Sequence, residues 1–240
     1  MKITVLTICP EQFDSFKEAV LVKRACERGL LELEIIDIRD YASGCFRHID
    51  DSPFGGGAGM IMRCQPVLDA LEECRKENSY TVLFAPSGNV YNQKKVHELT
   101  QKEHLILICG HYEGVDARVY EECDELLSIG DYVLSSGVIP SMAVIDSIVR
   151  LLGTIRTEST EDESFESGLL EYPQYTRPAE YKGKKVPDVL LSGNHEKIRL
   201  WRMKESLKRT RQVRPDLLEN RLLNKEEKKL LEEIEEDDAQ

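Results

Sequence analysis

Three loops follow apolar segments and carry the residues best suited to holding a small molecule. They are residues 85–88 (APSG), 109–114 (CGHYEG) and 129–137 (IGDYVLSSG). In an open sheet of parallel strands, ligands bind outside the carboxyl ends of the strands, and glycine lets backbone groups approach a ligand closely. None of the three matches the dinucleotide fingerprint or the P-loop. One such loop is more typical of a plain turn, but three on one sheet edge favour a pocket suited to an adenine and a ribose.

A glycine-rich segment and an acidic segment add two further candidates. Residues 50–60 (DDSPFGGGAGM) hold four glycines within five positions, which predicts either a flexible loop or a loop that closes over a ligand. Arg150 lies in an otherwise apolar segment, and residues 161–163 are all acidic. A carboxylate there could accept a proton from a ring N–H, and a guanidinium could stabilise charge on a neighbouring carbonyl oxygen. The alternative is a salt-bridged surface arginine beside a solvated acidic linker.

Alternating predicted strands and helices must position these loops. Short apolar segments predict strands at residues 3–9, 33–38, 81–85, 105–109 and 126–129. Amphipathic segments predict helices at residues 11–28, 66–76, 92–103, 141–152 and 195–208, the last capped by Asn194, and a final helix after a capping box of Asn224 and Glu227. The strand at 81–85 is expected to break at 86–88, and residues 39–64 to form a long loop. The alternation predicts an α/β domain with a largely parallel sheet.

The charge of the chain is unevenly distributed. The net charge is −12, but residues 176–214 carry twelve basic and four acidic side chains, whereas residues 215–240 carry four basic and ten acidic ones. A concentrated basic segment can bind a polyanion even in an acidic protein, because phosphate contacts are local. A solvated charged helix is the other interpretation. Residues 153–176 are polar and without periodicity, so we expect a linker that is mobile in the free protein.

Cysteine spacing and hydropathy limit the class of protein. None of the seven cysteines forms a C-x-x-C pair, and several lie within apolar segments. This pattern favours buried thiols in a reducing cytosol over a zinc site or a disulfide framework. No apolar run reaches the roughly 20 residues that a membrane span requires. We therefore expect a cytoplasmic protein with no membrane segment.

Five motifs, in order along nearly the whole chain, resemble the bacterial tRNA (guanine-N1)-methyltransferase family of the SPOUT superfamily. They are GGGAGM at 55–60, CGHYEG at 109–114, SIGDYVLSSG at 128–137, DESFESGLLEYPQYTRP at 162–178 and VPDVLLSGNHEKIRLWR at 186–202. The YPQYTRP and LLSGNH…WR blocks are the most specific. The spacings between the motifs are also similar to those of the family.

The resemblance implies a fold, a reaction and an assembly. The fold would be an α/β SPOUT-type parallel sheet with a deep trefoil knot, plus a small all-α C-terminal domain. Residues 1–160 would bind S-adenosyl-L-methionine, residues 161–176 would be a flexible linker, and residues 177–240 would hold the anticodon arm of tRNA. The enzyme would methylate N1 of guanosine 37, immediately 3′ of the anticodon. It would be a homodimer with its active sites at the subunit interface, and Mg²⁺ would assist.

The resemblance also implies roles for particular residues. Arg150 would stabilise O6 of the guanine, and either Asp162 or Glu163 would be the general base. The motif can be aligned in two ways, and each alignment places a different one of these two acids at the position of the base. The residues expected to bind the cofactor are Leu83, Phe84, Pro86, Gly110, Tyr112, Glu113, Gly114, Ile129, Gly130, Asp131, Tyr132, Val133, Leu134, Gly137 and Pro140.

This chain departs from the family pattern at several positions. His111 stands where the family often has arginine, and Ser136 and Val138 stand where it has glycine and glutamate. The stretch between Arg150 and the Ser-Phe pair is also about two residues shorter than usual. Two other functions remain: a related SPOUT enzyme that modifies a different nucleoside, and a non-catalytic RNA-binding protein that does not bind S-adenosyl-L-methionine.

Overall fold

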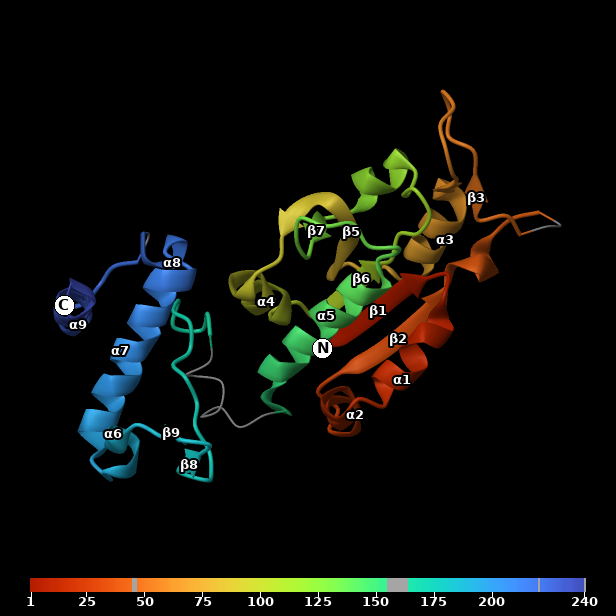
Figure 1. Ribbon diagram of the computed structural model, residues 1–240. Coiled ribbons are helices and arrows are strands. Elements are labelled where there is room, and N and C mark those ends of the chain that lie inside the picture. The colour runs from red at the N-terminus through yellow and green to blue at the C-terminus, as the bar shows by residue number, and fades with distance from the viewer. Residues whose placement is uncertain (45–46, 155–163, 220, 240) are drawn as a thin grey trace. The chain divides into compact units, whose positions relative to one another are not determined.

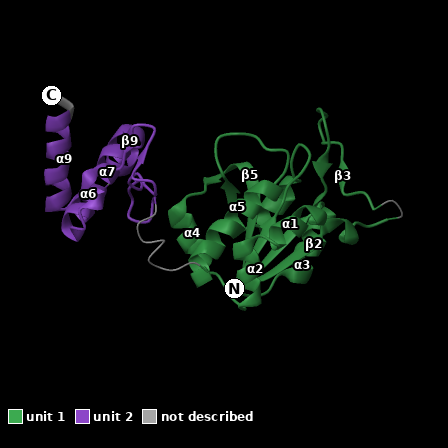
Figure 2. Cartoon of the chain, turned by 60° about the horizontal axis from the view of Figure 1, so that its bottom comes forward, with its two compact units in different colours: residues 1–155 green, residues 156–240 purple. Residues whose placement is uncertain are grey.

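The chain divides into two compact units, residues 1–155 and residues 156–240 (Figure 2). The computed structural model describes residues 1–44, 47–154, 164–219 and 221–239.

The first unit is built on a five-stranded sheet in which every strand pairing is parallel (Figure 1). The strand order is β2-β1-β6-β5-β7. The strands are β1 (Lys2–Thr7), β2 (Glu32–Asp37), β5 (Ser79–Val90), β6 (His104–Ile108) and β7 (Glu125–Ser128). All five residues of the central strand β6 are buried. A strand covered on both faces reads as a continuous apolar run, so the α/β parallel sheet predicted from the sequence is confirmed.

Two apolar layers lie on opposite faces of this sheet. Successive side chains of a strand point to opposite faces; Leu105 and Leu107 of β6 join one core cluster, and Ile106 and Ile108 join the other. The first cluster packs under α2 (Val20–Glu27), α4 (Gln93–Thr100) and α5 (Val138–Val149), and the second under α3 (Cys64–Cys74). Helices α3, α4 and α5 begin and end within a few residues of their predicted bounds.

Three local predictions were wrong. The helix predicted at 11–28 is a 3-10 turn (Pro10–Phe13), a short helix α1 (Asp14–Lys17) and α2, because Ala19 takes an extended conformation. Strand β5 does not end at residues 86–88. It continues through them, and its register against β7 shifts there. The long loop contains a small hairpin of β3 (Asp50–Asp51) and β4 (Ile61–Met62).

The second unit is mainly helical. Its elements are a two-stranded hairpin of β8 (Glu180–Tyr181) and β9 (Lys184–Lys185), and the helices α6 (Asp188–Leu191), α7 (His195–Val213), α8 (Asp216–Glu219) and α9 (Lys225–Ala239). Its small core consists of Leu169, Leu207, Leu230 and Ile234. Both predicted helix starts are confirmed. The Asn194 side chain accepts a hydrogen bond from the Lys197 N–H, and Asn224 and Glu227 cap each other reciprocally.

The described part of the predicted linker contacts this helical core. Leu169 is buried in the core, and the Leu170 N–H donates a hydrogen bond to Thr210 Oγ1 of α7 at 2.9 Å. The Phe165 N–H donates to the Leu169 carbonyl at 2.8 Å. Residues from Ser164 onward therefore belong structurally to the second unit, while the mobility of the segment stays a prediction.

A buried histidine makes the stability of the first unit depend on pH. His104 is 5% exposed, and its ring nitrogens hydrogen-bond Thr4 Oγ1 at 2.9 Å and Ser79 Oγ at 2.8 Å. Burial lowers the pKa of His104 from its ordinary value of 6.5. As the pH falls below about 6.5, His104 takes up a proton in the unfolded chain but stays neutral in the folded chain. We therefore expect the free energy of unfolding to fall with pH in that range.

Urea unfolding of the wild type and His104→Gln at pH 7.5 and 5.5 measures this dependence. The variant should lose less stability on acidification than the wild type does. His111, whose pKa burial also lowers, contributes in the same direction, so part of the dependence should remain. His97→Gln on the exposed side of α4 serves as the control, and an equal reduction in both variants would contradict the assignment to His104.

Candidate functional site

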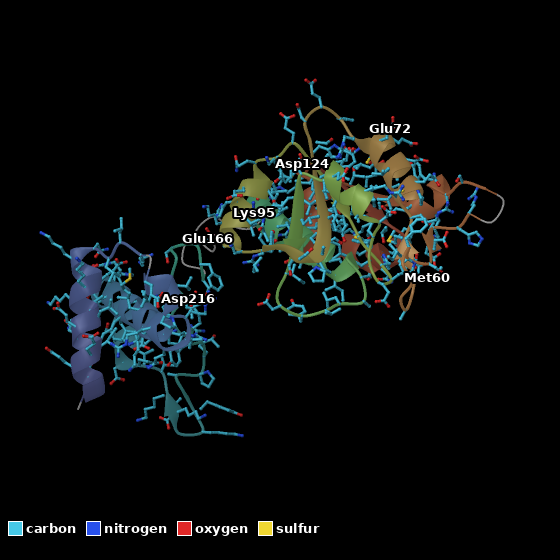
Figure 3. All side chains as sticks on the ribbon, turned by 90° about the horizontal axis from the view of Figure 1, so that it is seen from above. Met60, Glu72, Lys95, Asp124, Glu166 and Asp216 are labelled. Carbon is cyan, nitrogen blue, oxygen red and sulfur yellow. The ribbon has the colours of Figure 1, made fainter. Side chains whose placement is uncertain are left out.

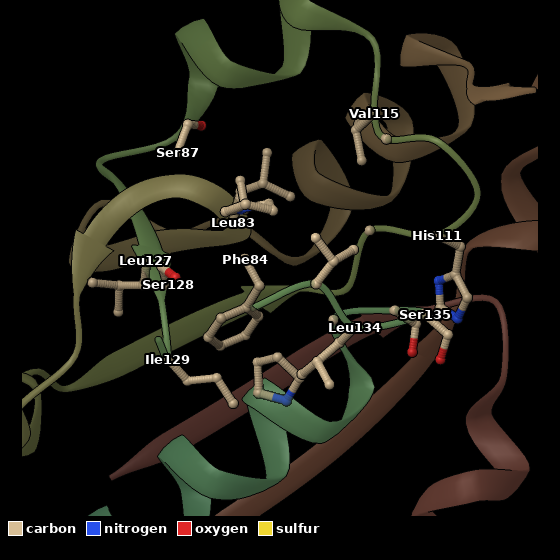
Figure 4. A pocket seen from close by; sticks show the side chains of 18 of the residues that line it. Leu83, Phe84, Ser87, His111, Val115, Leu127, Ser128, Ile129, Leu134 and Ser135 are labelled. Atoms are coloured by element: carbon tan, nitrogen blue, oxygen red, sulfur yellow. The ribbon is translucent and has the colours of Figure 1, made fainter. Parts of the chain in front are cut away.

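The three loops predicted to converge line one cavity of about 360 Å³ (Figure 4). Residues 109–114 follow β6 and residues 129–137 follow β7, whereas residues 85–88 lie within β5 where its register against β7 shifts. Strand β5 lies between β6 and β7 in the sheet. Because all strands are parallel, their carboxyl ends meet at one edge, and that edge is the usual place for a ligand in such sheets. The volume is in the range typical of small-molecule sites.

Most residues predicted to bind the cofactor line this cavity. The fourteen that do are Leu83, Phe84, Pro86, Gly110, Tyr112, Glu113, Gly114, Ile129, Gly130, Tyr132, Val133, Leu134, Gly137 and Pro140. Asp131 does not line it; its side chain is exposed in the turn after Gly130. Nine further residues line the cavity but were not predicted to bind the cofactor: Ala85, Ser87, His111, Val115, Tyr120, Leu127, Ser128, Ser135 and Ser136. Most are direct neighbours of predicted residues, but Tyr120 comes from a separate 3-10 helix (Ala117–Glu122) and no sequence signal indicated it.

Gly137 joins two of the loops by a close backbone approach. Its N–H donates a hydrogen bond to the Gly110 carbonyl at 2.8 Å. A Cβ atom on Gly137 would lie 2.7 Å from Cys109 Cα and 3.0 Å from Gly110 N. Its φ of −75° suits any residue, so glycine is required here for space and not for conformation. Gly137 is also the N-cap of α5, and the start of this helix therefore forms part of the cavity wall.

The glycine-rich loop is attached to the same wall. The Glu113 N–H donates to the Met60 carbonyl at 3.0 Å, and the Met62 N–H donates to the Gly114 carbonyl at 2.9 Å. Figure 3 marks Met60 at the end of this loop, which extends from the body of the unit. At the opposite end, Phe54 is fully exposed. The loop is thus anchored beside the cavity by its base.

His111 presents an unused polar atom at the cavity wall. Its Nδ1 lies 3.2 Å from the Cys109 carbonyl oxygen, which can only accept, so Nδ1 carries the proton. Nε2 is buried and has no hydrogen-bond partner among the described residues. Burial lowers the pKa of His111, which favours the neutral ring. A polar ligand in the cavity would relieve the cost of this unpaired acceptor.

The predicted catalytic residues are not brought together by the described part of the chain. Arg150 is half-buried where α5 passes into a π-helical turn (Arg150–Thr154), and it does not line the cavity. Asp162 and Glu163 lie outside the described residues. The arginine therefore stands apart from the cavity of its own chain.

The described residues offer no metal site or membrane span. Within residues 1–44, 47–154, 164–219 and 221–239, no group of three His, Cys, Asp or Glu side chains could hold a metal ion. The expected Mg²⁺ therefore has no cluster of protein ligands within these described ranges. In the same ranges no helix is long and apolar enough to cross a membrane.

The acidic C-terminal segment neutralises part of the basic segment. Helix α9 lies against α7, and three basic side chains of α7 form ion pairs with acidic side chains of α9. The pairs are Arg199–Glu226 (2.7 Å), Lys204–Asp237 (2.9 Å) and Arg211–Glu235 (3.5 Å). Exposed pairs contribute little stability each, so apolar contacts of Leu207 with Leu230 and Ile234 hold α9 in place. The basic surface of this unit is therefore smaller than the sequence indicated.

Comparisons with known proteins agree with this geometry. The family model described as tRNA (Guanine-1)-methyltransferase TrmD matches residues 1–220. A tRNA (guanine-N(1)-)-methyltransferase of Fusobacterium nucleatum is 52% identical over 241 residues, covering all of both chains. Proteins of the same name from Dictyoglomus turgidum and Halalkalibacterium halodurans are 48% and 49% identical, each over 98% of this chain and over 96% and 98% of their own length. The chain therefore belongs to the tRNA (guanine-1)-methyltransferase TrmD family.

Proposed function

We propose that this protein transfers a methyl group from S-adenosyl-L-methionine to N1 of guanosine 37 in tRNA. The observation that carries the proposal is the cavity lined by residues 83–87 of β5 and by the loops after β6 and β7, in a chain that belongs to this family along nearly its whole length. The protein is then a tRNA (guanine-N1)-methyltransferase, which acts in the cytoplasm, where its substrate is found.

The reaction is tested with purified protein, methyl-labelled S-adenosyl-L-methionine and unmodified tRNA carrying guanosine 37. Mass spectrometry of the digested tRNA should find 1-methylguanosine at that position and nowhere else. A tRNA with adenosine 37 is the control and should gain no label. Label on another nucleoside would indicate a related SPOUT enzyme, and binding of tRNA without any label or cofactor binding would indicate a non-catalytic protein.

The cavity suits the methyl donor in shape and chemistry. Three loops supply backbone amides and carbonyls that can hold an adenine edge and a ribose, and the apolar side chains of Leu83, Phe84 and Pro140 line the same space. The close approach at Gly137 and the unpaired Nε2 of His111 both favour a bound polar ligand. The donor supplies a methyl group on a positively charged sulfur. In the SPOUT fold the loops would also form a trefoil knot around it.

The catalytic step requires a base and a stabilising cation. Formation of the N1–methyl bond requires the methyl–sulfur bond of the donor to break, which would leave a neutral thioether, and the N1–H bond of guanine to break, with Asp162 or Glu163 accepting that proton. Charge then builds on O6, where the Arg150 guanidinium stabilises it. Because Arg150 does not line the cavity of its own chain, a site shared between two subunits is the arrangement that we propose. Sedimentation of the free protein as a dimer would agree with it.

Replacing Arg150 with alanine should lower the single-turnover rate of methylation by about 100- to 1000-fold, the usual cost of losing one such charge-stabilising group. The affinity for S-adenosyl-L-methionine should change less than threefold. Arg28→Ala is the matched control, because the exposed Arg28 side chain donates a hydrogen bond to the Gly153 carbonyl in the turn that follows Arg150. Equal rate losses in both variants would mean that disturbance of this turn, and not loss of the Arg150 charge, lowers the rate of methylation.

The remaining expectations concern the partners. Residues 177–240 would hold the anticodon arm through basic side chains that α9 leaves unpaired. Mg²⁺ assistance stays a prediction, because the described residues present no carboxylate cluster and Mg²⁺ commonly keeps several waters and binds substrate oxygens. Removal of the ion with a chelator, followed by the methylation assay, tests the requirement.

A further inference from the structure

Two aromatic side chains of the second unit form a partly exposed surface. The ring of Tyr175 and the ring of Trp201 have centroids 6.3 Å apart and planes inclined by 53°. Tyr175 is 48% exposed, and Trp201 on α7 is half-buried. A fully packed aromatic pair would be hidden in a core, whereas this pair keeps an open side.

The segment that carries Tyr175 is held on α7 at two points before it. The Leu170 N–H donates to Thr210 Oγ1, and the Arg202 guanidinium carbon lies 4.8 Å from the centroid of the Tyr172 ring. Arg202 Nε is buried without a hydrogen-bond partner among the described residues. The position of Tyr175 beside Trp201 is therefore set by the fold, so little ordering would be needed when a ligand binds.

Unpaired basic side chains lie on the same side of α7. At 3.6 residues per turn, Lys197 and Lys208 are within about 40° of Trp201 around the helix axis. Among the residues that the structure describes, neither forms an ion pair within 4 Å, although the Lys208 charge contributes to lowering the pKa of Asp237 on α9. Glu205 is the acidic side chain on this side, so the net charge remains positive. Of the three bases paired with α9, Lys204 and Arg211 lie about 60° and 80° from Trp201 around the helix axis, and Arg199 lies about 160° from it.

We infer that Tyr175 and Trp201 form a stacking surface for an unpaired nucleobase of the tRNA substrate. Sequence-tolerant RNA binding typically combines aromatic faces, on which bases stack, with cations that contact the adjacent phosphates. Both are present here, on one side of one helix. A second protein surface is the other possible occupant, but the flanking lysines favour a polyanion. The inference rests on the proposed function only in naming tRNA as the RNA.

The tryptophan itself provides the measurement, because Trp201 is the only tryptophan in the chain. Titration of the full-length protein with unmodified tRNA should quench its fluorescence, and a blunt RNA duplex of equal charge should quench it much less. Tyr175→Leu should weaken tRNA binding about tenfold, while Tyr175→Phe, which keeps the ring, should bind like the wild type. Tyr181→Ala is the control; Tyr181 is 62% exposed on the hairpin and pairs with Lys182.

Three results would overturn the inference. They are equal quenching by duplex RNA, unchanged tRNA affinity of Tyr175→Leu, and a change in fluorescence on raising the protein concentration without RNA, which would assign the surface to a second copy of the chain. Thermal melting of each variant checks that it is folded. Failure of the proposed function is distinguishable, because it would appear as wild-type protein that binds tRNA and forms no 1-methylguanosine.

Discussion

Gly137→Ala is expected to abolish measurable binding of S-adenosyl-L-methionine and with it all methylation. The added Cβ would lie 2.7 Å from Cys109 Cα, and that neighbour is backbone that cannot rotate away. The loops at 109–114 and 129–137 would have to separate, breaking the hydrogen bond between the Gly137 N–H and the Gly110 carbonyl. Overpacking of this kind typically costs 1–3 kcal/mol, so we expect the free energy of unfolding to fall by about 3 kcal/mol.

Gly110→Ala is a matched control in the same cavity. Its Cβ would meet only a methyl group of Val115, at 3.1 Å, and the Phe84 carbonyl oxygen at 3.8 Å. The Val115 side chain can shift by a few tenths of an ångström, so the expected loss of cofactor affinity is at most tenfold. Calorimetry with the cofactor and urea unfolding of both variants make the comparison. Similar affinities for the wild type and Gly137→Ala would show that the cofactor binds elsewhere.

Asp162→Asn or Glu163→Gln should lower the single-turnover rate by about 100- to 10,000-fold, the range found for loss of a general base. An amide has nearly the shape of the carboxyl group but does not accept the N1 proton. Only one of the two substitutions should have this effect, because a single proton leaves. The other should change the rate by less than threefold, as should the control Glu161→Gln in the same acidic run.

The pH dependence of the rate distinguishes a base from a residue that merely positions the RNA. In the wild type the rate should fall at low pH as the carboxylate is protonated, and the variant that lacks the base should lose this dependence. Cofactor and tRNA affinities are measured alongside. If neither substitution lowers the rate by tenfold or more, the linker carboxylates have no role in proton transfer.

The sequence alone was sufficient for features that depend on local residue types. The apolar run at 105–109 predicted a strand, which β6 (His104–Ile108) confirms, and the alternation of strands with helices predicted the parallel sheet. The caps at Asn194 and Asn224 were predictable for the same reason, since a capping bond spans only three residues. The convergence of the three loops followed from the direction of parallel strands. Family membership followed from the order and spacing of the motifs.

Contacts between distant segments required the tertiary structure. The opposite charges of residues 176–214 and 215–240 partly cancel, because α9 folds against α7 and pairs with it. The exposure of Asp131 and the approach of Gly137 to Cys109 depend on how loops from different strands meet. The pairing of Tyr175 with Trp201 joins residues 26 positions apart. Such contacts are decided by how apolar faces pack in three dimensions, and neither propensity nor periodicity along the chain contains that information.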